Sequence, residues 1–183
     1  MSLGRAVFFD RDGTLVVSGL IAGVPVPCHD INSLKYLDDA PSICIWLKRS
    51  GIKTFLVTNQ PDIARGHVSI EDVEKVNSRI LHDCQLTDIA MCIHDDKDDC
   101  NCRKPRSGML RSLSREHNID LLNSFMVGDR SKDISAGFDA GCKTIFLDHG
   151  YGETSRVCPD HSVRSLKDMI QLIANFFDIP ILK

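Results

Sequence analysis

Five short apolar runs, spaced along the chain, constrain its fold more strongly than any other feature of the sequence. They cover residues 6–9, 53–57, 88–92, 125–127 and 144–147. Short and nearly continuous apolar runs are typical of strands that are covered on both faces. Segments with helical spacing separate them, so strands and helices alternate. This order predicts an α/β fold with one Rossmann-like domain, in which a central parallel sheet carries helices on both faces.

The helical segments have recognisable starts and stops. Ser69 with Asp72, and Ser165 with Asp168, resemble capping boxes. Apolar residues at helical spacing between positions 40 and 47 end before Gly51, and residues 107–117 and 131–140 have the same character. Residues 16–35 lack a period and are expected to form a long loop or a small flap, which leaves only a minimal cap. Residues 1–183 are therefore expected to form a single domain.

Composition excludes several classes of protein. The net charge of −3 over 183 residues offers no broad basic surface for nucleic acid. No apolar run approaches the roughly 20 residues of a membrane span, and the N-terminus lacks the long apolar core of a signal peptide. We expect no membrane partner and, without an obvious apolar stripe, a monomer.

Cysteine usage indicates the compartment. Three of the eight cysteines lie within residues 92–102 beside a histidine, and five are scattered. This pattern fits a reducing compartment and a metal better than a disulfide framework, so we expect a cytoplasmic protein.

Three of the predicted strands end in residues that can do chemistry. Asp10, Thr58 and Asp129 each follow an apolar run. In a parallel sheet the carboxyl ends of the strands form the ligand-binding edge, so these residues are expected to meet there. One such residue alone would be an ordinary turn residue, but three together indicate an active site.

The residue types suit phosphoryl transfer. The carboxylate of Asp10 is a suitable nucleophile, and Asp12 can donate a proton to the leaving oxygen and later accept one from water. Mg²⁺ can sit against Asp10, Asp129 and a backbone carbonyl, with Lys104 supplying positive charge and Thr58 a neutral donor. The sequence therefore predicts a Mg²⁺-dependent phosphatase.

Four segments carry a resemblance to a known family. FFDRDGTL, LVTNQ, CRKP and MVGDRSKD resemble, in order, the four motifs of the haloacid dehalogenase superfamily. An acid at position 12 is typical of its phosphatases. The resemblance implies that Asp10 is nucleophile and metal ligand, and that Asp12 is general acid/base and a ligand through its carbonyl. It further implies that Thr58 and Lys104 bind the phosphate, while Asp129 binds Mg²⁺ with Asp133 supporting that shell.

A cysteine- and histidine-rich loop follows the third apolar run. Cys92, His94, Cys100 and Cys102 offer three sulfurs and one nitrogen within 11 residues. This set fits tetrahedral zinc with no open position, which predicts a structural zinc site in a loop at 92–102. Because Lys104 is two residues further on, zinc would fix the loop that places this lysine. Reduced cysteines without metal, or a surface disulfide, are the alternatives.

The zinc loop, with TNQ and IARG, narrows the resemblance to the D-glycero-D-manno-heptose 1,7-bisphosphate 7-phosphatases and the related histidinol-phosphate phosphatases. The segment CRKPRSGM favours the heptose branch, whose enzymes serve lipopolysaccharide, capsule or S-layer glycans. This resemblance implies that the substrate, a small phosphorylated sugar, contacts Asn59, Gln60, Arg103 and Arg130. Pro61 and Asp62 depart from the small pair that is usual there, and residues 16–30 depart from the expected shorter flap.

Three interpretations remain open from the sequence. The first is a sugar-bisphosphate phosphatase, which needs a second cationic patch such as Arg103, Arg130 and Arg65. The second is a histidinol-phosphate phosphatase, whose imidazole substrate would favour an acidic or aromatic neighbour. The third is a catalytically inactive phosphate-binding module, which predicts the loss of an essential residue that is in fact retained.

Overall fold

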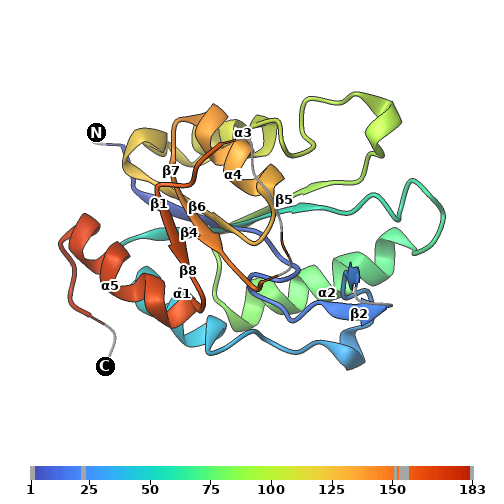
Figure 1. The fold of residues 1–183 in the computed structure, drawn as a ribbon, viewed down its shortest axis with the longest axis horizontal. Coiled ribbons are helices and arrows are strands. Elements are labelled where there is room, and N and C mark those ends of the chain that lie inside the picture. The colour runs from blue at the N-terminus through green and yellow to red at the C-terminus, as the bar shows by residue number, and fades with distance from the viewer. Residues whose placement is uncertain (1–2, 22–23, 151, 153–156, 182–183) are drawn as a thin grey trace.

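A six-stranded parallel sheet forms the centre of the molecule (Figure 1). The computed structural model describes residues 3–21, 24–150, 152 and 157–181. The strand order is β5-β4-β1-β6-β7-β8, with β1 at Ala6–Phe9, β4 at Lys53–Asn59, β5 at Asp88–Cys92, β6 at Phe125–Gly128, β7 at Lys143–Leu147 and β8 at His161–Val163. The predicted fold class, a parallel sheet in an α/β domain, is confirmed.

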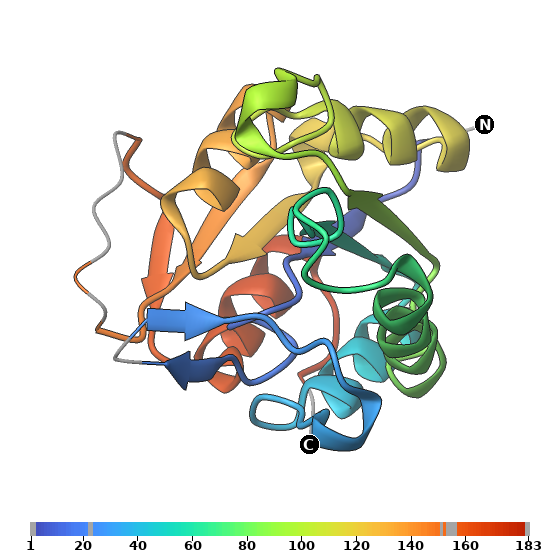
Figure 2. The same cartoon turned by 90° about the vertical axis from the view of Figure 1, so that its right-hand side faces the viewer.

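In the part of the chain that the structure describes, α-helices lie on both faces of the sheet (Figures 1 and 2). One core contains Val7 and Phe9 together with residues of α1, α2 and α5, and the other contains Ala6 and Phe8 with residues of α3 and α4. Successive β1 residues therefore face opposite cores, which explains why that strand is apolar throughout. The helices span Ala40–Arg49 (α1), Ile70–Asp83 (α2), Gly108–His117 (α3), Ser131–Ala140 (α4) and Leu166–Phe177 (α5).

The predicted helix starts are confirmed. The side chain of Ser69 accepts a hydrogen bond from the backbone N–H of Asp72, and Ser165 does the same for Asp168. Each cap satisfies a helix N–H group that has no partner within the helix. Among the described residues, no helix is long and apolar enough to cross a membrane.

Two features differ from the expectation. Residues 16–35 contain an antiparallel hairpin of β2 (Gly19–Ile21) and β3 (Val24–Val26), followed by the short helix η1 (Ile31–Ser33). The sequence predicts five strands of the main sheet but not β8, which has only three residues, two of them exposed. Such a short edge strand lacks the continuous apolar run by which a buried strand is recognised.

The hairpin and one long loop lie near the carboxyl ends of the strands. In Figure 2 the hairpin is blue and lies in the lower half, while the light-green loop from β5 to α3 lies at the top. Both segments contribute residues to the same pocket, including Val26 and Pro27 from the hairpin side and Asp96 and Arg103 from the loop. The fold therefore leaves an opening over the sheet edge that small loops, rather than a cap domain, border.

Candidate active site

The carboxyl ends of three central strands bring the predicted reactive residues into one pocket of about 300 Å³. Asp10 follows β1, Thr58 lies near the end of β4, and Asp129 follows β6. Lys104 comes from the loop before α3, and Asp133 from the first turn of α4. All five line the pocket, although they are up to 123 residues apart in sequence (Asp10 to Asp133).

Lys104 lies at the centre of this group and is almost completely buried. Its Nζ donates to Asp10 Oδ1 at 2.6 Å and to the carbonyl oxygen of Val57 at 2.8 Å, and it lies 2.6 Å from Asp133 Oδ1. Burial opposes the charge of the ammonium, but Asp10 and Asp133 outweigh it and raise the pKa of Lys104. The lysine is therefore held as a cation against the predicted nucleophile.

The backbone of Lys104 is fixed as well as its side chain. Asn59 Nδ2 donates to the carbonyl oxygen of Lys104 at 3.0 Å, and the N–H of Lys104 donates to Asn59 Oδ1 at 3.1 Å. This two-bond clamp ties the loop before α3 to the end of β4. Asn59, expected to contact the substrate, lines the pocket and also positions the lysine.

The carboxylates around the lysine carry more negative charge than it neutralises. Oxygen atoms of Asp10, Asp129 and Asp133 lie within 4.8 Å of one another. Burial, followed by repulsion from Asp10 and Asp133, raises the pKa of Asp129 to about 8. Burial also raises the pKa of Asp10 to about 6, against the attraction of Lys104.

This cluster suits a small divalent cation. Asp129 Oδ1 is buried and has no hydrogen-bond partner among the residues that the structure describes, which is costly for a carboxylate oxygen unless a ligand satisfies it. Hard carboxylate oxygens are the donors that Mg²⁺ prefers. The residues present therefore fit the metal that the sequence analysis expected, with Asp10 and Asp129 as the side chains that would hold it.

Two glycines allow the close approach of the acidic residues. Gly13 has a φ of +80°, and a Cβ there would lie 2.2 Å from Asp129 Oδ2. A Cβ on Gly128 would lie 2.3 Å from the Cβ of Asp133. Any larger residue at either position would push a site carboxylate away, so the glycines belong to the geometry of the site.

Asp12 also lines the pocket, and three neighbouring groups hold its carboxylate. Arg11 Nε donates to Asp12 Oδ2 at 2.9 Å, the N–H of Cys28 donates to Oδ1 at 2.8 Å, and Gln60 Nε2 donates to Oδ2 at 3.0 Å. Gln60 Nε2 also lies 2.9 Å from Thr58 Oγ1. The predicted acid/base is thus oriented by donors from the turn after β1, from the flap and from the residue that follows β4.

The residues expected to contact substrate lie in different surroundings. Arg103 and Arg130 line the pocket. Arg103 Nε already pairs with Asp96 at 2.7 Å. Gln60 is completely buried, and its amide points to Asp12, Thr58 and His29. This position indicates an indirect role for Gln60, through the orientation of the acid/base.

Some pocket residues were not singled out from the sequence. Lys132 lines the pocket beside Arg103, and burial followed by that neighbouring charge lowers its pKa. The sequence signal for Lys132 is its position in the segment MVGDRSKD, between the predicted site residues Arg130 and Asp133.

Arg65, a candidate for the second cationic patch, forms ion pairs with Asp95 at 2.6 Å and with Asp62 at 3.4 Å.

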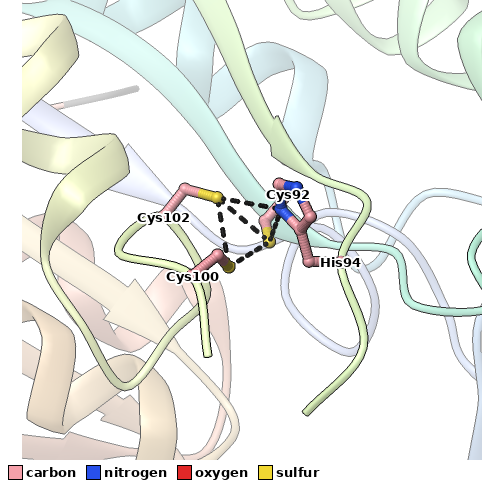
Figure 3. Close-up of side chains that lie close together, drawn as sticks. All are labelled: Cys92, His94, Cys100 and Cys102. Carbon is pink, nitrogen blue, oxygen red and sulfur yellow. Dashed lines mark hydrogen bonds between the residues drawn. The ribbon is translucent and has the colours of Figure 1, made fainter. Parts of the chain in front are cut away.

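The four predicted zinc ligands converge at the end of β5, as Figure 3 shows. The sulfur atoms of Cys92, Cys100 and Cys102 are 3.4–3.6 Å apart, and His94 Nδ1 lies 3.3 Å from Cys102 Sγ and 3.6 Å from Cys92 Sγ. Disulfide sulfurs would be about 2.05 Å apart. The edge of a tetrahedron with Zn–S bonds of 2.3 Å is about 3.8 Å. The spacing therefore fits ligands around one ion and excludes a disulfide among these three thiols.

Comparison with known proteins places this site in a family. Residues 101–169 match the HAD-hydrolase-like family. The chain is 37% identical over 157 residues to D-glycero-beta-D-manno-heptose-1,7-bisphosphate 7-phosphatase of Haemophilus influenzae. This match covers 79% of this chain and 82% of the relative. It is 30% identical over 148 residues to D-glycero-alpha-D-manno-heptose-1,7-bisphosphate 7-phosphatase of Campylobacter jejuni, covering 78% and 81%.

A solved structure shares the whole fold. The D,D-heptose 1.7-bisphosphate phosphatase from B. bronchiseptica, complexed with magnesium and phosphate, has a TM-score of 0.76 and 23% identity, and the match covers 96% of this chain and 97% of that chain. Sequence identity with the curated relatives extends over most of both chains. This protein therefore belongs to the haloacid dehalogenase family of phosphatases, in the group that contains the heptose-1,7-bisphosphate 7-phosphatases.

Proposed function

We propose that this phosphatase removes the 7-phosphate of D-glycero-D-manno-heptose 1,7-bisphosphate in the biosynthesis of nucleotide-activated heptose. The observation that carries the chemistry is the contact of 2.6 Å between buried Lys104 and Asp10 at the end of β1. The names of the relatives support the substrate. Because those names include both the alpha and the beta anomer, the proposal leaves the anomer to experiment.

Asp10 is the proposed nucleophile. Its carboxylate attacks the phosphorus, the bond to the sugar oxygen breaks, and an aspartyl phosphate forms. The raised pKa of about 6 still leaves most of the carboxyl ionised at pH 7. Lys104 reduces the repulsion between this carboxylate and the phosphate dianion, while Thr58 supplies a neutral donor.

Asp12 is the proposed acid/base. It gives its proton to the sugar oxygen as that bond breaks, and then accepts a proton from the water that opens the aspartyl phosphate. The carboxyl thereby returns to its starting protonation state after each turnover. Arg11, Gln60 and the N–H of Cys28 orient it.

Mg²⁺ is the proposed cofactor, held by Asp10, Asp129 and the backbone carbonyl of Asp12, with Asp133 in support. When bound, it neutralises charge on the phosphate and polarises its oxygens. The buried and unpartnered Asp129 Oδ1 supports this site. Asp133 accepts a hydrogen bond from the backbone N–H of Arg130 and pairs with Lys104. It therefore links the start of α4 to the buried lysine.

Structural zinc is the second proposed metal, bound by Cys92, His94, Cys100 and Cys102. Burial raises the pKa of Cys92 to about 12 in the absence of metal, whereas hydrogen bonds from Cys102 and Cys92 overcome the desolvation of Cys100 and lower its pKa to about 7. A zinc ion would stabilise all three as thiolates. Because the thiols must stay reduced, we place the enzyme in the cytoplasm.

A second candidate substrate is histidinol phosphate. Asp62 lines the pocket at a position where the sequence departs from the small pair of residues that is usual in the resembled family. Its carboxylate pairs with Arg65 at 3.4 Å and lies 4.0 Å from His29 Nε2. An acidic group at the rim would attract a cationic imidazole, so this substrate belongs in the first activity test.

The first prediction concerns substrate choice. Purified protein with Mg²⁺ is expected to release phosphate faster from one heptose 1,7-bisphosphate anomer than from fructose 1,6-bisphosphate or histidinol phosphate. Asp10→Asn should reduce the rate to background because the nucleophile is lost. Preference for histidinol phosphate would overturn the substrate and keep the mechanism, whereas activity retained by Asp10→Asn would overturn the mechanism.

The second prediction concerns pH and Mg²⁺. The pKa of Asp129 is about 8 in the folded protein and 3.8 as the ordinary value, so between these values the folded state binds more protons than the unfolded state. The free energy of unfolding without Mg²⁺ should therefore fall as pH rises. Mg²⁺ should raise the thermal midpoint more at about pH 8 than at about pH 6, because protons compete with it at the lower pH.

Thermal unfolding in Mg²⁺-free buffer without chelator, which leaves zinc in place, measures this effect. Asp129→Asn, which keeps the shape of the side chain but cannot ionise, is the matched variant. We expect it to show a smaller pH dependence and a weaker response to Mg²⁺. An unchanged pH dependence and an unchanged Mg²⁺ response in Asp129→Asn would contradict the prediction.

The third prediction concerns zinc. The purified chain should contain one zinc ion, and Cys100→Ser should lower both the zinc content and the thermal midpoint, the latter by more than about 5 °C. Phosphatase activity should fall as well, because Lys104 follows the loop. Cys158→Ser, at an exposed cysteine outside the cluster, is the control and should keep full zinc content. Elemental analysis that finds no zinc in the unsubstituted protein would refute the assignment.

A further inference from the structure

The arginine next to the nucleophile is completely buried. Arg11 has 0% exposed surface, which is rare for an arginine unless its donors are all engaged. Its Nη1 donates to Asn77 Oδ1 at 3.0 Å, and its Nη2 donates to the carbonyl oxygen of Cys28 at 2.8 Å. The third nitrogen, Nε, donates to Asp12 Oδ2 at 2.9 Å.

These contacts join three parts of the fold that the sequence separates. Arg11 and Asp12 lie in the turn after β1, Cys28 lies in the flap segment after β3, and Asn77 is a buried residue of α2. The planar guanidinium reaches all three at once through separate N–H groups. A lysine has one nitrogen and no such fork, so it cannot keep the same set of contacts.

Arg11, Asp12 and Cys28 also form a closed ring of hydrogen bonds. Cys28 accepts from Arg11 through its carbonyl oxygen and donates to Asp12 Oδ1 through its N–H. Arg11 contacts both oxygens of Asp12, with Nη2 at 3.3 Å from Oδ1. The carboxylate is therefore held on both oxygens by the turn and the flap together.

We propose that Arg11 is a positioning residue that fixes the orientation of the Asp12 carboxylate and couples it to the flap at Cys28 and to α2 at Asn77. This inference rests on the acid/base role proposed for Asp12. Arg11 does not line the pocket, so it acts on the reaction through Asp12 rather than by contact with substrate. Correct orientation matters because proton transfer needs the donor oxygen within hydrogen-bonding reach of the leaving oxygen.

Substrates with different leaving groups separate positioning from a merely structural role. A sugar alkoxide is a poor leaving group and needs a proton from Asp12, whereas p-nitrophenolate leaves without one. The ratio kcat/KM reports formation of the aspartyl phosphate, before the water step, for both substrates. A loss confined to the sugar phosphate therefore reports the acid, and an equal loss for both substrates reports general damage to the pocket.

The test compares kcat/KM of Arg11→Met and Arg11→Lys for the preferred sugar bisphosphate and for p-nitrophenyl phosphate, with Mg²⁺ and zinc bound. We expect Arg11→Met to lose at least about tenfold on the sugar phosphate and less than about threefold on p-nitrophenyl phosphate. Arg11→Lys should recover part of the loss. Arg79→Met, an exposed arginine of α2 that pairs with Asp83, is the matched control and should change neither value.

Asp12→Asn, measured in parallel, distinguishes failure of the positioning role of Arg11 from failure of the acid/base role of Asp12. It should lose about 10²–10⁴-fold on the sugar phosphate and much less on p-nitrophenyl phosphate. If Asp12→Asn shows this pattern and both Arg11 variants lose activity equally on the two substrates, or lose none, the positioning role is overturned alone. If Asp12→Asn affects both substrates equally, the acid/base role and the inference fall together. Should Arg11→Met fail to fold, the same comparison on Arg11→Lys decides.

Discussion

The ion pair between Lys104 and Asp10 is the contact on which the rest of the site depends. A lysine with 2% exposure is tolerated only because Asp10 and Asp133 surround its ammonium. Removal of either partner would leave a buried charge poorly compensated. The constraint extends beyond the pocket, because Asn59 fixes the backbone of the lysine and the cluster of Cys92, His94, Cys100 and Cys102 lies in the loop that leads to it.

The parts of this site that the sequence predicts are those with local signals. Apolar runs identified the strands, and the reactive residues Asp10, Thr58 and Asp129 stand at their ends, where parallel topology brings them together without knowledge of any side chain. The four predicted zinc ligands of the 92–102 loop lie within 11 residues, so their convergence needs only one turn of the chain. The resemblance to the family motifs assigned roles to Lys104 and Asp133. Their distance from Asp10 along the sequence does not by itself indicate that they lie near it in the fold.

The parts that the sequence could not predict depend on contacts between distant residues. The hydrogen-bond partners of Arg11, Cys28 and Asn77, are 17 and 66 residues away in the sequence. An arginine next to a predicted nucleophile gives no sequence signal that its side chain is buried. The strands of the flap hairpin have three residues each, GLI and VPV, and include a glycine and a proline, while β8 (HSV) has no apolar run. Packing and pairing therefore decide the conformation of these segments. Gln60 was placed near substrate by its motif, whereas its burial between Asp12 and Thr58 follows from tertiary packing.

The charges at the rim add a condition on how an anionic substrate binds. Arg65 pairs with Asp95 and Arg103 pairs with Asp96, two acidic residues of the 92–102 loop. Asp96 is 77% exposed, and an ion pair with such a partner contributes little to stability. A phosphate with two negative charges can therefore replace Asp96 on Arg103 at small cost, while Arg103 stays anchored through Nη1 to the carbonyl oxygen of His94. The 92–102 loop thus supplies both the carbonyl oxygen that anchors this arginine and the carboxylate that neutralises it when no anion is bound.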